Sequence, residues 1–196
     1  MDIVLASNNK HKLKEVRDIL YGYNILSLHQ IGFNAEIEET GATIFENALI
    51  KAREIRKHTD KMIIADDTGL FVHALNDEPG VYSARYAGES ATFEDNNNKL
   101  LKALENKEDR SAVFKCAIAL NTPSGEEKIF SGQVNGQIAK EYCGTGGFGY
   151  DPIFIPDGMD KTYANLSSEE KDKLSHRAKA LSEMKKYLES IKQAIR

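Results

Sequence analysis

Two adjacent carboxylates, Asp66 and Asp67, follow a short apolar run and precede a threonine and a glycine. The apolar run Met62–Ala65 predicts a buried strand, and ligands of open α/β sheets gather at the carboxyl ends of such strands. Side chains alternate along a strand, so only one of the two carboxylates can face a given site. A buried, ionised carboxylate needs a paired charge or a bound cation. The alternative is that one aspartate caps the next turn and water solvates the other.

A basic segment near the start of the chain has the composition of an anion site. It lies between a predicted strand, Asp2–Ala6, and a helix with Leu13, Val16 and Leu20 at helical spacing. Cations in the first turn of a helix oppose its dipole unless an anion joins them. The alternative is a solvated basic turn. The segment consists of Ser7, Asn8, Asn9, Lys10, His11 and Lys12.

A second acidic segment, Glu36–Gly41, precedes a helix that we expect to begin near Thr43. Thr43 and Glu46 have the spacing of a capping box. Lys51 lies on a different face of this helix from the apolar stripe, so it can reach a ligand or simply water; from the segment alone, solvation is the simpler interpretation. The predicted stripe consists of Phe45, Ala48, Leu49, Ala52 and Ile55.

The segment Gly144–Pro152 places four glycines around Phe148. Glycine lets a backbone approach a ligand closely, and an exposed ring in such a loop suits packing against a flat molecule. Alternatively, Phe148 folds back into the core. Further on, a short helix is predicted over Ser167–Lys173, and Ser175 caps the last helix. His176 and Arg177 lie in the first turn of that helix, where positive charge opposes the helix dipole. A lone histidine there is usually exposed to water, but the adjacent Arg177, with Lys171 one turn upstream, favours a bound anion or polar ligand.

The remaining patterns predict a mixed sheet. A strand is expected at Asn24–Leu28 and a polar helix over residues 92 to 106. The strands Ala112–Leu120 and Lys128–Ile138 are joined by a Pro-Ser-Gly turn, which indicates a hairpin. Because the other strands alternate with helices, this hairpin makes the sheet mixed rather than purely parallel.

Bulk properties narrow the class of protein. The 196 residues suit one large domain or two small lobes, and the net charge of −4 argues against a general nucleic-acid binder. Cys116 and Cys143 have no metal-ligand spacing, and we expect reduced, partly buried thiols. No signal peptide and no membrane-spanning run is present in the sequence, so we expect a cytoplasmic protein without a membrane partner.

Six segments, in this order along nearly the whole chain, resemble the non-canonical purine nucleoside triphosphate pyrophosphatases, the family of inosine triphosphate pyrophosphatase and Ham1-like proteins. Each motif is weak alone, and the six together are specific. Ser7 and Asn8 depart mildly from the Gly or Thr that is frequent in the first motif. The segments are Ser7–Lys12, Glu38–Gly41 with Glu46–Ala48, Ala65–Gly69, Pro79–Tyr86, Gly144–Phe154 and Ser175–Arg177.

The resemblance implies an α/β protein with a mixed, curved central sheet flanked by helices, forming a single domain over residues 1–196 with two lobes around a deep substrate cleft. It implies a homodimer that hydrolyses the triphosphates of inosine, deoxyinosine and xanthosine to the nucleoside monophosphate and pyrophosphate. It also implies a divalent metal, normally Mg²⁺.

The resemblance also implies a role for each matching residue. Asp67 is the catalytic carboxylate and, with Glu39, the metal site, although Glu38 is an alternative to Glu39. Whether Asp67 acts first as a base or as a metal ligand stays open. Ser7, Asn8, Asn9, Lys10, His11, Lys12, Lys51 and Lys171 face the triphosphate, and Thr68, Phe148, Gly149, Tyr150, Asp151, His176 and Arg177 face the rest of the nucleotide.

Two other functions compete with this one. A pyrophosphatase of related architecture would act on pyrimidine or methylated nucleotides, and the Phe148 loop with the His176–Arg177 pair argues against it. A non-catalytic nucleotide-binding regulator would keep the ring and the lysines but would not need Asp67 and Glu39. Magnesium-dependent release of pyrophosphate distinguishes the enzyme from the regulator.

Overall fold

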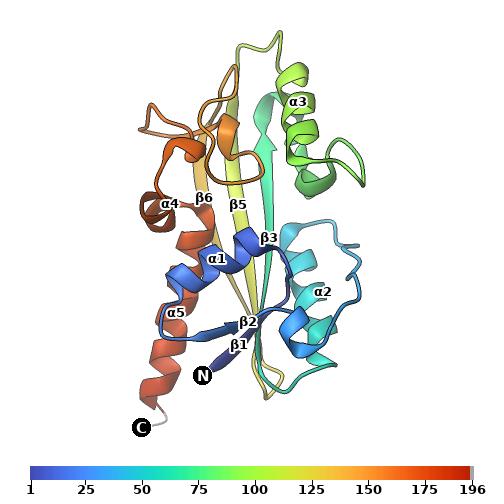
Figure 1. Cartoon of the computed structure of the whole chain (residues 1–196), viewed down its shortest axis with the longest axis vertical. Helices are drawn as coiled ribbons and strands as arrows, with labels where there is room; N and C mark the ends of the chain where they lie inside the picture. Colours follow the sequence, from blue (N-terminus) through green and yellow to red (C-terminus); the bar gives the residue numbers. More distant parts are fainter. Residues whose placement is uncertain (195–196) are drawn as a thin grey trace. The chain divides into compact units, whose positions relative to one another are not determined.

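A computed structural model of the chain describes residues 1–194 (Figure 1). The strands are β1 (Asp2–Leu5), β2 (Asn24–Leu26), β3 (Met62–Val72), β4 (Pro79–Gly80), β5 (Ser111–Asn121), β6 (Glu127–Ile138) and β7 (Phe154–Pro156). The α-helices are α1 (Lys10–Ile19), α2 (Ile44–Arg56), α3 (Phe93–Ala103), α4 (Ser168–Leu174) and α5 (His176–Ala194). Short 3₁₀ helices lie at His29–Ile31, His73–Leu75, Ser83–Arg85, Asp151–Ile153 and Tyr163–Asn165.

The strands form one mixed sheet. Its order is β2-β1-β3-β5-β6-β7, and β4 pairs with β3. β1 is parallel to β2 and β3, whereas β3–β4 and β6–β7 are antiparallel. β5 and β6 are neighbours joined by a tight turn, in which the Gly125 N–H donates to the carbonyl oxygen of Thr122 at 2.9 Å. The predicted mixed sheet with flanking helices and the predicted hairpin are confirmed.

The chain divides into two compact units, which we describe separately. Unit 1 comprises Met1–Asp67, Cys116–Gly132 and the described chain from Arg177 onward; unit 2 comprises Thr68–Lys115 and Gln133–His176. The chain passes from one unit to the other within β3, β5 and β6 and at the start of α5.

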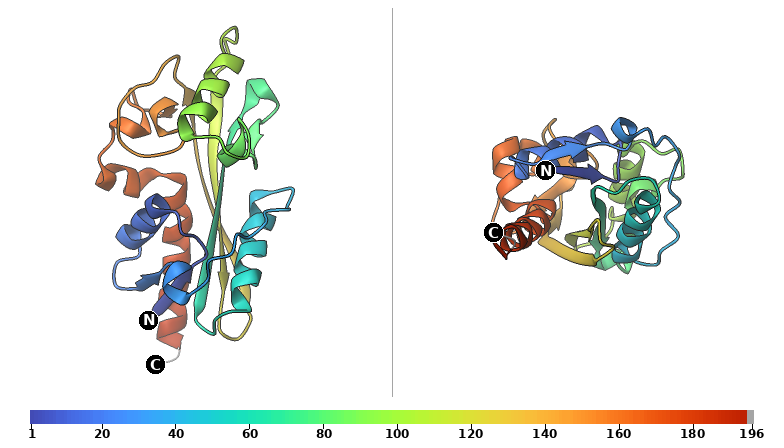
Figure 2. Two further views of the ribbon diagram at one scale, coloured as in Figure 1. Left: turned by 45° about the vertical axis from the view of Figure 1, so that its right-hand side comes forward. Right: turned by 90° about the horizontal axis from the view of Figure 1, so that it is seen from below.

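In unit 1, helices cover both faces of the strands. α1 and α5 lie on one face and α2 lies on the other, as both side views show (Figures 1 and 2). The first face buries alternate residues of β1, β3 and β5 against α1 and α5, with Ile64, Ile118 and Leu181 at its centre. Burial of alternate residues follows the pleat of the strands, so consecutive side chains of one strand point toward helices on opposite faces of the sheet.

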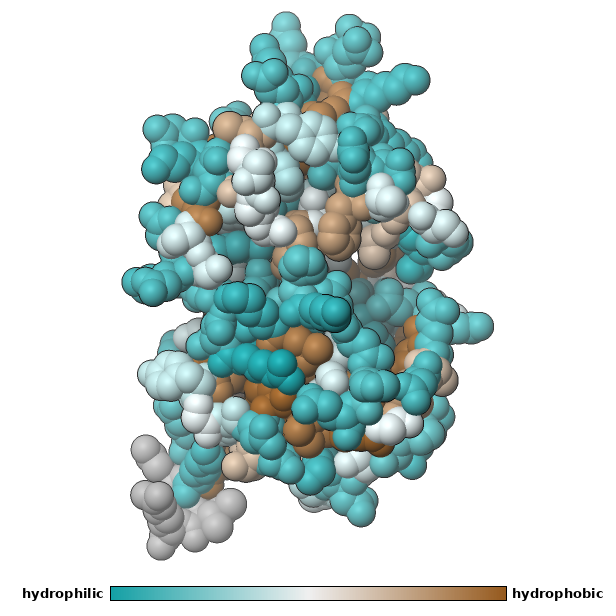
Figure 3. Space-filling model, viewed as in Figure 1, coloured by the Kyte–Doolittle hydropathy of each residue, from teal (hydrophilic) through white to brown (hydrophobic). Residues whose placement is uncertain are grey.

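In unit 2, an apolar core of aromatic and aliphatic side chains lies between the strands, α3 and the loops that follow β6. Its members include Leu70, Leu100, Phe114, Phe154 and Tyr163, and Phe114 makes an edge contact with Phe154 at 4.7 Å between ring centroids. The face of the molecule seen in Figure 1 is mostly hydrophilic, with smaller hydrophobic areas (Figure 3). Within the described chain, no helix combines the length and apolarity that crossing a membrane requires.

Several predicted boundaries shift in the structure. β2 ends at Leu26, two residues early, because a 3₁₀ turn follows at His29–Ile31. α3 covers Phe93–Ala103 within the predicted range. The acidic pair does not end its strand: β3 continues to Val72 because Leu70 and Val72 are also fully buried.

The apolar face of α2 also differs from the prediction. Phe45 is 40% exposed, and Ile44 takes its place in the buried stripe with Ala48, Ala52 and Ile55. Positions 44, 48, 52 and 55 follow the helical period, whereas a side chain at position 45 points about 100° away. The capping box of Thr43 and Glu46 at the start of this helix is confirmed.

Candidate functional site

The acidic pair of β3 sends its two carboxylates to different partners. Asp66 pairs with Lys12 and Arg177, which come from α1 and α5, whereas Asp67 pairs with Lys51 of α2. These helices cover opposite faces of the unit 1 strands, so the predicted alternation is confirmed. Neither aspartate is a solvated turn residue, because both are buried.

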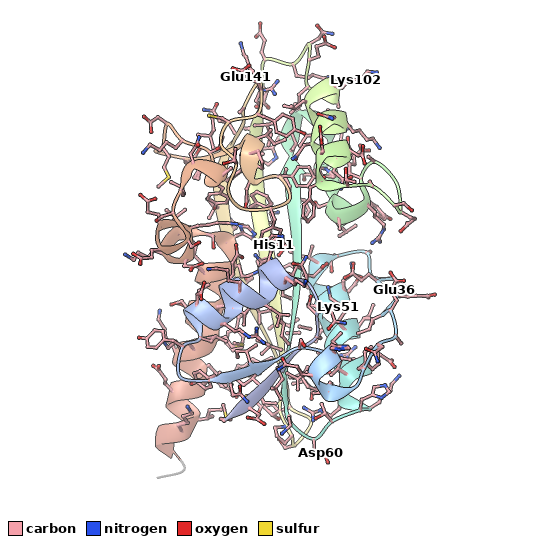
Figure 4. All side chains as sticks on the ribbon, in the orientation of Figure 1. His11, Glu36, Lys51, Asp60, Lys102 and Glu141 are labelled. Carbon is pink, nitrogen blue, oxygen red and sulfur yellow. The ribbon has the colours of Figure 1, made fainter. Side chains whose placement is uncertain are left out.

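The face toward α2 holds an acid–base–acid chain. The Lys51 Nζ atom lies 2.5 Å from the Glu39 Oε1 atom and 3.1 Å from the Asp67 Oδ1 atom. Lys51 is buried, so it is not the solvated side chain that its position off the apolar stripe suggested. Two carboxylates compensate its buried charge. Figure 4 labels Lys51 on α2 and His11 in the first turn of α1.

Burial and neighbouring charges shift both pKa values in this chain. Burial raises the pKa of the Asp67 carboxyl, and the charge of Glu39 adds to this, while Lys51 and Lys12 oppose it. Burial alone would lower the pKa of Lys51, but the charges of Asp67 and Glu39 raise it. The pKa values of Lys51 and Asp67 can both be raised, because two carboxylates stabilise the charge of Lys51, whereas Asp67 shares this one lysine with Glu39. The arrangement thus keeps a firmly protonated lysine beside a carboxylate that takes up a proton more readily than usual.

The opposite face of β3 holds a second charged group around Asp66. The Arg177 Nε atom donates to the Asp66 Oδ2 atom at 2.8 Å, Arg177 also pairs with Glu15, and Lys12 pairs with Asp66. Burial would raise the pKa of Asp66, but the charges of Arg177, Lys12 and Lys51 hold it well below its usual range. Asp66 is therefore ionised at neutral pH and anchors two cations.

The segment before α1 is built as a helix cap. The Asn9 Oδ1 atom accepts the backbone N–H groups of His11 at 2.9 Å and Lys12 at 3.2 Å. Ser7 Oγ accepts the N–H of Asn9, and Asn8 Oδ1 accepts that of His29. The first turn of α1 contains no acidic residue, so the cations Lys10 and Lys12 and the helix dipole act together there. An anion at this position stays a prediction.

The carboxylates of Asp67 and Glu39 suit a divalent cation that needs few protein ligands. Among the described residues, no cluster of three or more His, Cys, Asp or Glu side chains could hold a metal. The Asp67 Oδ2 atom is buried and has no hydrogen-bond partner in the described chain. Mg²⁺ commonly binds through one or two carboxylates, several waters and substrate phosphates rather than in an all-protein cage. Asp67 and Glu39 match that donor set.

In unit 2, Asp151 organises the glycine-rich loop. Its Oδ2 atom accepts the backbone N–H of Phe148 at 2.8 Å and the Lys171 Nζ atom at 2.6 Å, and both charged side chains are buried. Gly147 has a φ of +72°, and a Cβ added there would lie 2.1 Å from Asp151 Oδ2. The loop therefore needs glycine at this position in order to close around the carboxylate.

The ring of Phe148 is half-buried and borders open space. Lys171 Nζ lies 4.7 Å from its centroid. On another side, a pocket of about 410 Å³ is lined by Phe148, Phe93 and Asn97 among others. Phe148 is absent from the core of unit 2, so the alternative of a ring folded into the core does not describe it.

Tyr150 and Gly149 have structural contacts as well as a predicted role. Tyr150 is buried, and its hydroxyl donates to the carbonyl oxygen of Ser83 at 2.8 Å. Burial raises the pKa of this phenol. The carbonyl oxygen of Gly149 accepts the Asn97 Nδ2 donor at 3.0 Å. Thr68 is half-buried at the start of the unit 2 part of β3. The contacts of Gly149 and Tyr150 hold the chain directly after Phe148.

His176 and Arg177 are both buried, so neither is an exposed first-turn residue. The His176 ring stacks on Phe114 of unit 2 with centroids 4.5 Å apart and planes 6° apart. Arg177 is 2% exposed and belongs to the Asp66 group of unit 1. A contact of either residue with a nucleotide stays a prediction.

Three polar residues gained no role from the sequence yet have one here. Glu15 binds Arg177, Asn97 holds Gly149, and Asn47 accepts the backbone N–H of Gly41. Glu15 follows the segment Ser7–Lys12 but lies outside it, and Asn97 lies on a helix that contains none of the six segments. Asn47 lies within the segment Glu46–Ala48 that carried part of the resemblance, so its position contained a signal.

The sequence is similar to known proteins over nearly its full length. A model of the Ham1 family matches residues 3–187. The dITP/XTP pyrophosphatase of Thermoanaerobacter pseudethanolicus is 50% identical over 192 residues, which cover 96% of both chains. The dITP/XTP pyrophosphatase of Bacillus subtilis is 50% identical over 193 residues, covering 96% of this chain and 98% of that one.

The fold is similar to solved structures. The Ham1 protein of Staphylococcus aureus matches with a TM-score of 0.88 and 45% identity, covering 97% of this chain and 99% of the other. A nucleoside-triphosphatase, also described as a dITP/XTP pyrophosphatase, from Mycobacterium abscessus matches with a TM-score of 0.76 and 46% identity, covering 94% and 98%.

Proposed function

The chain belongs to the Ham1 family, and we propose that it hydrolyses non-canonical purine nucleoside triphosphates, dITP, ITP and XTP, to the monophosphate and pyrophosphate. The observation that carries this proposal is the buried chain Glu39–Lys51–Asp67. A protein that only binds nucleotides has no use for two carboxylates held against one lysine. An enzyme that must place a cation and activate water does.

Asp67 and Glu39 are the residues that would hold Mg²⁺, as the donor set described above allows. The bound ion supplies positive charge that offsets the phosphate oxygens and stabilises the leaving pyrophosphate. Lys51 keeps both carboxylates in register, because its ammonium group contacts each of them. The cations of the first turn of α1 add positive charge for the β- and γ-phosphates.

Asp67 is the group that handles the proton. Its raised pKa makes it a stronger base than an ordinary aspartate, and its Oδ2 atom has no hydrogen-bond partner in the described chain. In the reaction, water attacks the α-phosphorus, its proton passes to Asp67, and the bond to the bridging oxygen breaks so that pyrophosphate leaves. A cation held by Asp67 would lower the pKa of that carboxylate, so holding the metal and accepting the proton would compete at this residue.

The Phe148 loop takes the nucleobase. A purine stacks on the ring of Phe148, and the exposed backbone N–H groups of the glycine-rich loop around that ring are hydrogen-bond donors. Hypoxanthine and xanthine present a 6-keto oxygen to such a donor, whereas adenine presents an amino group. A site built to hydrogen-bond one group rejects the analogue that lacks it, so we expect strong discrimination against ATP.

A panel of triphosphates tests the proposal. Purified protein is incubated with dITP, ITP, XTP, GTP and ATP, with and without Mg²⁺, and the products are followed by phosphorus NMR. We expect monophosphate and pyrophosphate from dITP, ITP and XTP only when Mg²⁺ is present. Orthophosphate and diphosphate as first products would mean a different hydrolase, and tight binding without turnover would mean a regulator. Sedimentation of the same preparation tests the homodimer, which we propose from the family resemblance.

A further inference from the structure

The turn that carries Glu39 is held by the first residues of α2. The Glu46 Oε2 atom accepts the backbone N–H groups of Ala42 at 2.6 Å and Thr43 at 3.2 Å. The Asn47 Oδ1 atom accepts the backbone N–H of Gly41 at 2.8 Å. Three successive backbone N–H groups are thus bound to side chains of the same helix. The capping box accounts for Thr43, and the same Glu46 carboxylate also binds the N–H of Ala42, but Asn47 reaches further, to Gly41, two residues from Glu39.

Asn47 is an unusual residue for a buried helix face. It is 0% exposed, and its Nδ2 atom has no hydrogen-bond partner in the described chain. A buried polar group without a partner costs free energy, so stability alone would favour an apolar side chain at this position. Gly41 is fitted to the contact: a Cβ added there would lie 2.7 Å from Asn47 Oδ1 and 2.6 Å from the Cβ atom of Glu46.

Asn47 and Lys51 lie one helical turn apart, so their side chains leave α2 on the same face. Lys51 binds the Glu39 carboxylate at 2.5 Å, and Asn47 binds the backbone two residues further along the same turn. The position of Glu39 is therefore set from two sides by one helix. If the Asn47 contact is lost, only Lys51 restrains the carboxylate, and the turn leading to it is free to shift.

We infer that Asn47 is a positioning residue for the reaction: through the N–H of Gly41 it places the Glu39 carboxylate where a divalent cation needs it. This inference rests on the proposed function, in which Glu39 is one of the metal-holding residues. Groups that orient a metal ligand typically change metal affinity 10- to 100-fold when they are removed.

The test is Mn²⁺ binding to the purified full-length protein, measured as loss of the free Mn²⁺ signal in electron paramagnetic resonance. We expect Asn47→Ala to weaken Mn²⁺ binding by about 10- to 100-fold. Gly41→Ala should do the same, because it breaks the contact from its other side. Asn47→Asp keeps the acceptor for the Gly41 N–H and should retain at least the wild-type affinity.

Asn97→Ala is the matched control. Asn97 is also a buried helical asparagine whose amide holds a loop backbone, but it does so in unit 2, at Gly149. This variant should keep wild-type Mn²⁺ affinity. The melting temperature of every variant shows how much stability each loses, so that a general loss of fold is separated from a specific loss of metal binding.

Two different negative results are distinguishable. If Glu39→Gln weakens Mn²⁺ binding but Asn47→Ala and Gly41→Ala do not, the positioning role of Asn47 is wrong and the proposed metal site stands. The same conclusion follows if Asn97→Ala weakens binding as much as Asn47→Ala. If Glu39→Gln itself binds Mn²⁺ like the wild type, the proposed role of Glu39 fails, and the inference about Asn47 fails with it.

Discussion

In unit 1 the candidate site residues are charged side chains fixed by a strand and three helices, whereas in unit 2 they surround a glycine-rich loop. The unit 1 group places Asp66 and Asp67 back to back on β3, each against its own cations. The unit 2 group contains one buried ion pair, Asp151–Lys171, beside the ring of Phe148. The first group is thus suited to phosphates and a cation, and the second to a flat base with one polar edge.

The two groups of residues should therefore affect different kinetic constants. Charge that stabilises a transition state changes kcat, metal dependence and pH dependence. A ring that stacks on substrate and transition state alike changes mainly KM. Within unit 1, the two aspartates of β3 also differ, because the pKa of Asp66 is lowered whereas that of Asp67 is raised.

Asp66→Asn should reduce the free energy of unfolding most, by about 3–5 kcal/mol at pH 7, because removing one partner of a buried ion pair leaves uncompensated charge. The folded-state pKa of Asp66 is lowered, so its stabilising contribution exists above the unfolded pKa of about 3.9 and is lost as pH falls through the folded value. Urea unfolding at pH 7, 5 and 3 should therefore show the gap between wild type and variant narrowing at the lowest pH. A constant gap would mean that Asp66 acts through packing.

Asp67→Asn should change catalysis more than it changes the free energy of unfolding. The folded-state pKa of Asp67 is raised, so its own ionisation weakens the fold at neutral pH, but its charge also compensates the buried Lys51, which keeps Glu39 as a second partner; the variant should therefore lose less stability than Asp66→Asn. Its kcat should nevertheless fall by at least about 10²-fold, since the proton acceptor is gone. In the wild type, kcat/KM should decline as pH falls through the raised pKa. A folded Asp67→Asn protein within a few-fold of wild-type activity would remove Asp67 from the mechanism.

Phe148→Ala tests unit 2. Loss of base stacking should cost about 1–3 kcal/mol of binding, which corresponds to a KM roughly 5- to 150-fold higher, with a smaller change in kcat. Steady-state kinetics with ITP measures both constants. Phe148→Leu, which keeps bulk but not the flat ring, is the control for packing. An unchanged KM in both variants would show that the ring does not touch the base.

The sequence predicted elements better than it predicted partners. Local signals such as the Thr43–Glu46 capping box and the hairpin turn depend on neighbours in sequence, and both are confirmed. The sequence does not decide between a ligand contact and water for Lys51, because the two carboxylates that bind it lie 12 and 16 positions away in the chain. Only the fold brings Glu39 and Asp67 to it.

In the candidate site, too, the sequence indicates individual residues but not the distant residues that they contact. The motifs pointed to Asp67, Phe148 and Lys171 through resemblance. They could not show that Asp66 anchors Arg177, a contact that spans 111 positions, or that Asn97 holds Gly149 across 52. The apolar pattern places Phe45 in the buried stripe of α2, yet this side chain is 40% exposed. The sequence does not show how far the surface that covers the helix extends. In physical terms, periodicity gives the face of a helix but not the width of what covers it.

The smallest expected effect is that of Asn97→Ala, and it tests whether the glycine loop depends on its anchors. The substitution removes one hydrogen bond to the Gly149 carbonyl oxygen, a contact worth about 1 kcal/mol. Because Gly149 follows Phe148 directly, the ring should then be less well placed, and KM for ITP should rise several-fold while kcat changes little. Lys102→Ala, at an exposed position of α3, is the control for a truncation on the same helix. If Asn97→Ala lowers kcat and leaves KM unchanged, the loop serves the chemical step and the division of labour between the two groups is wrong.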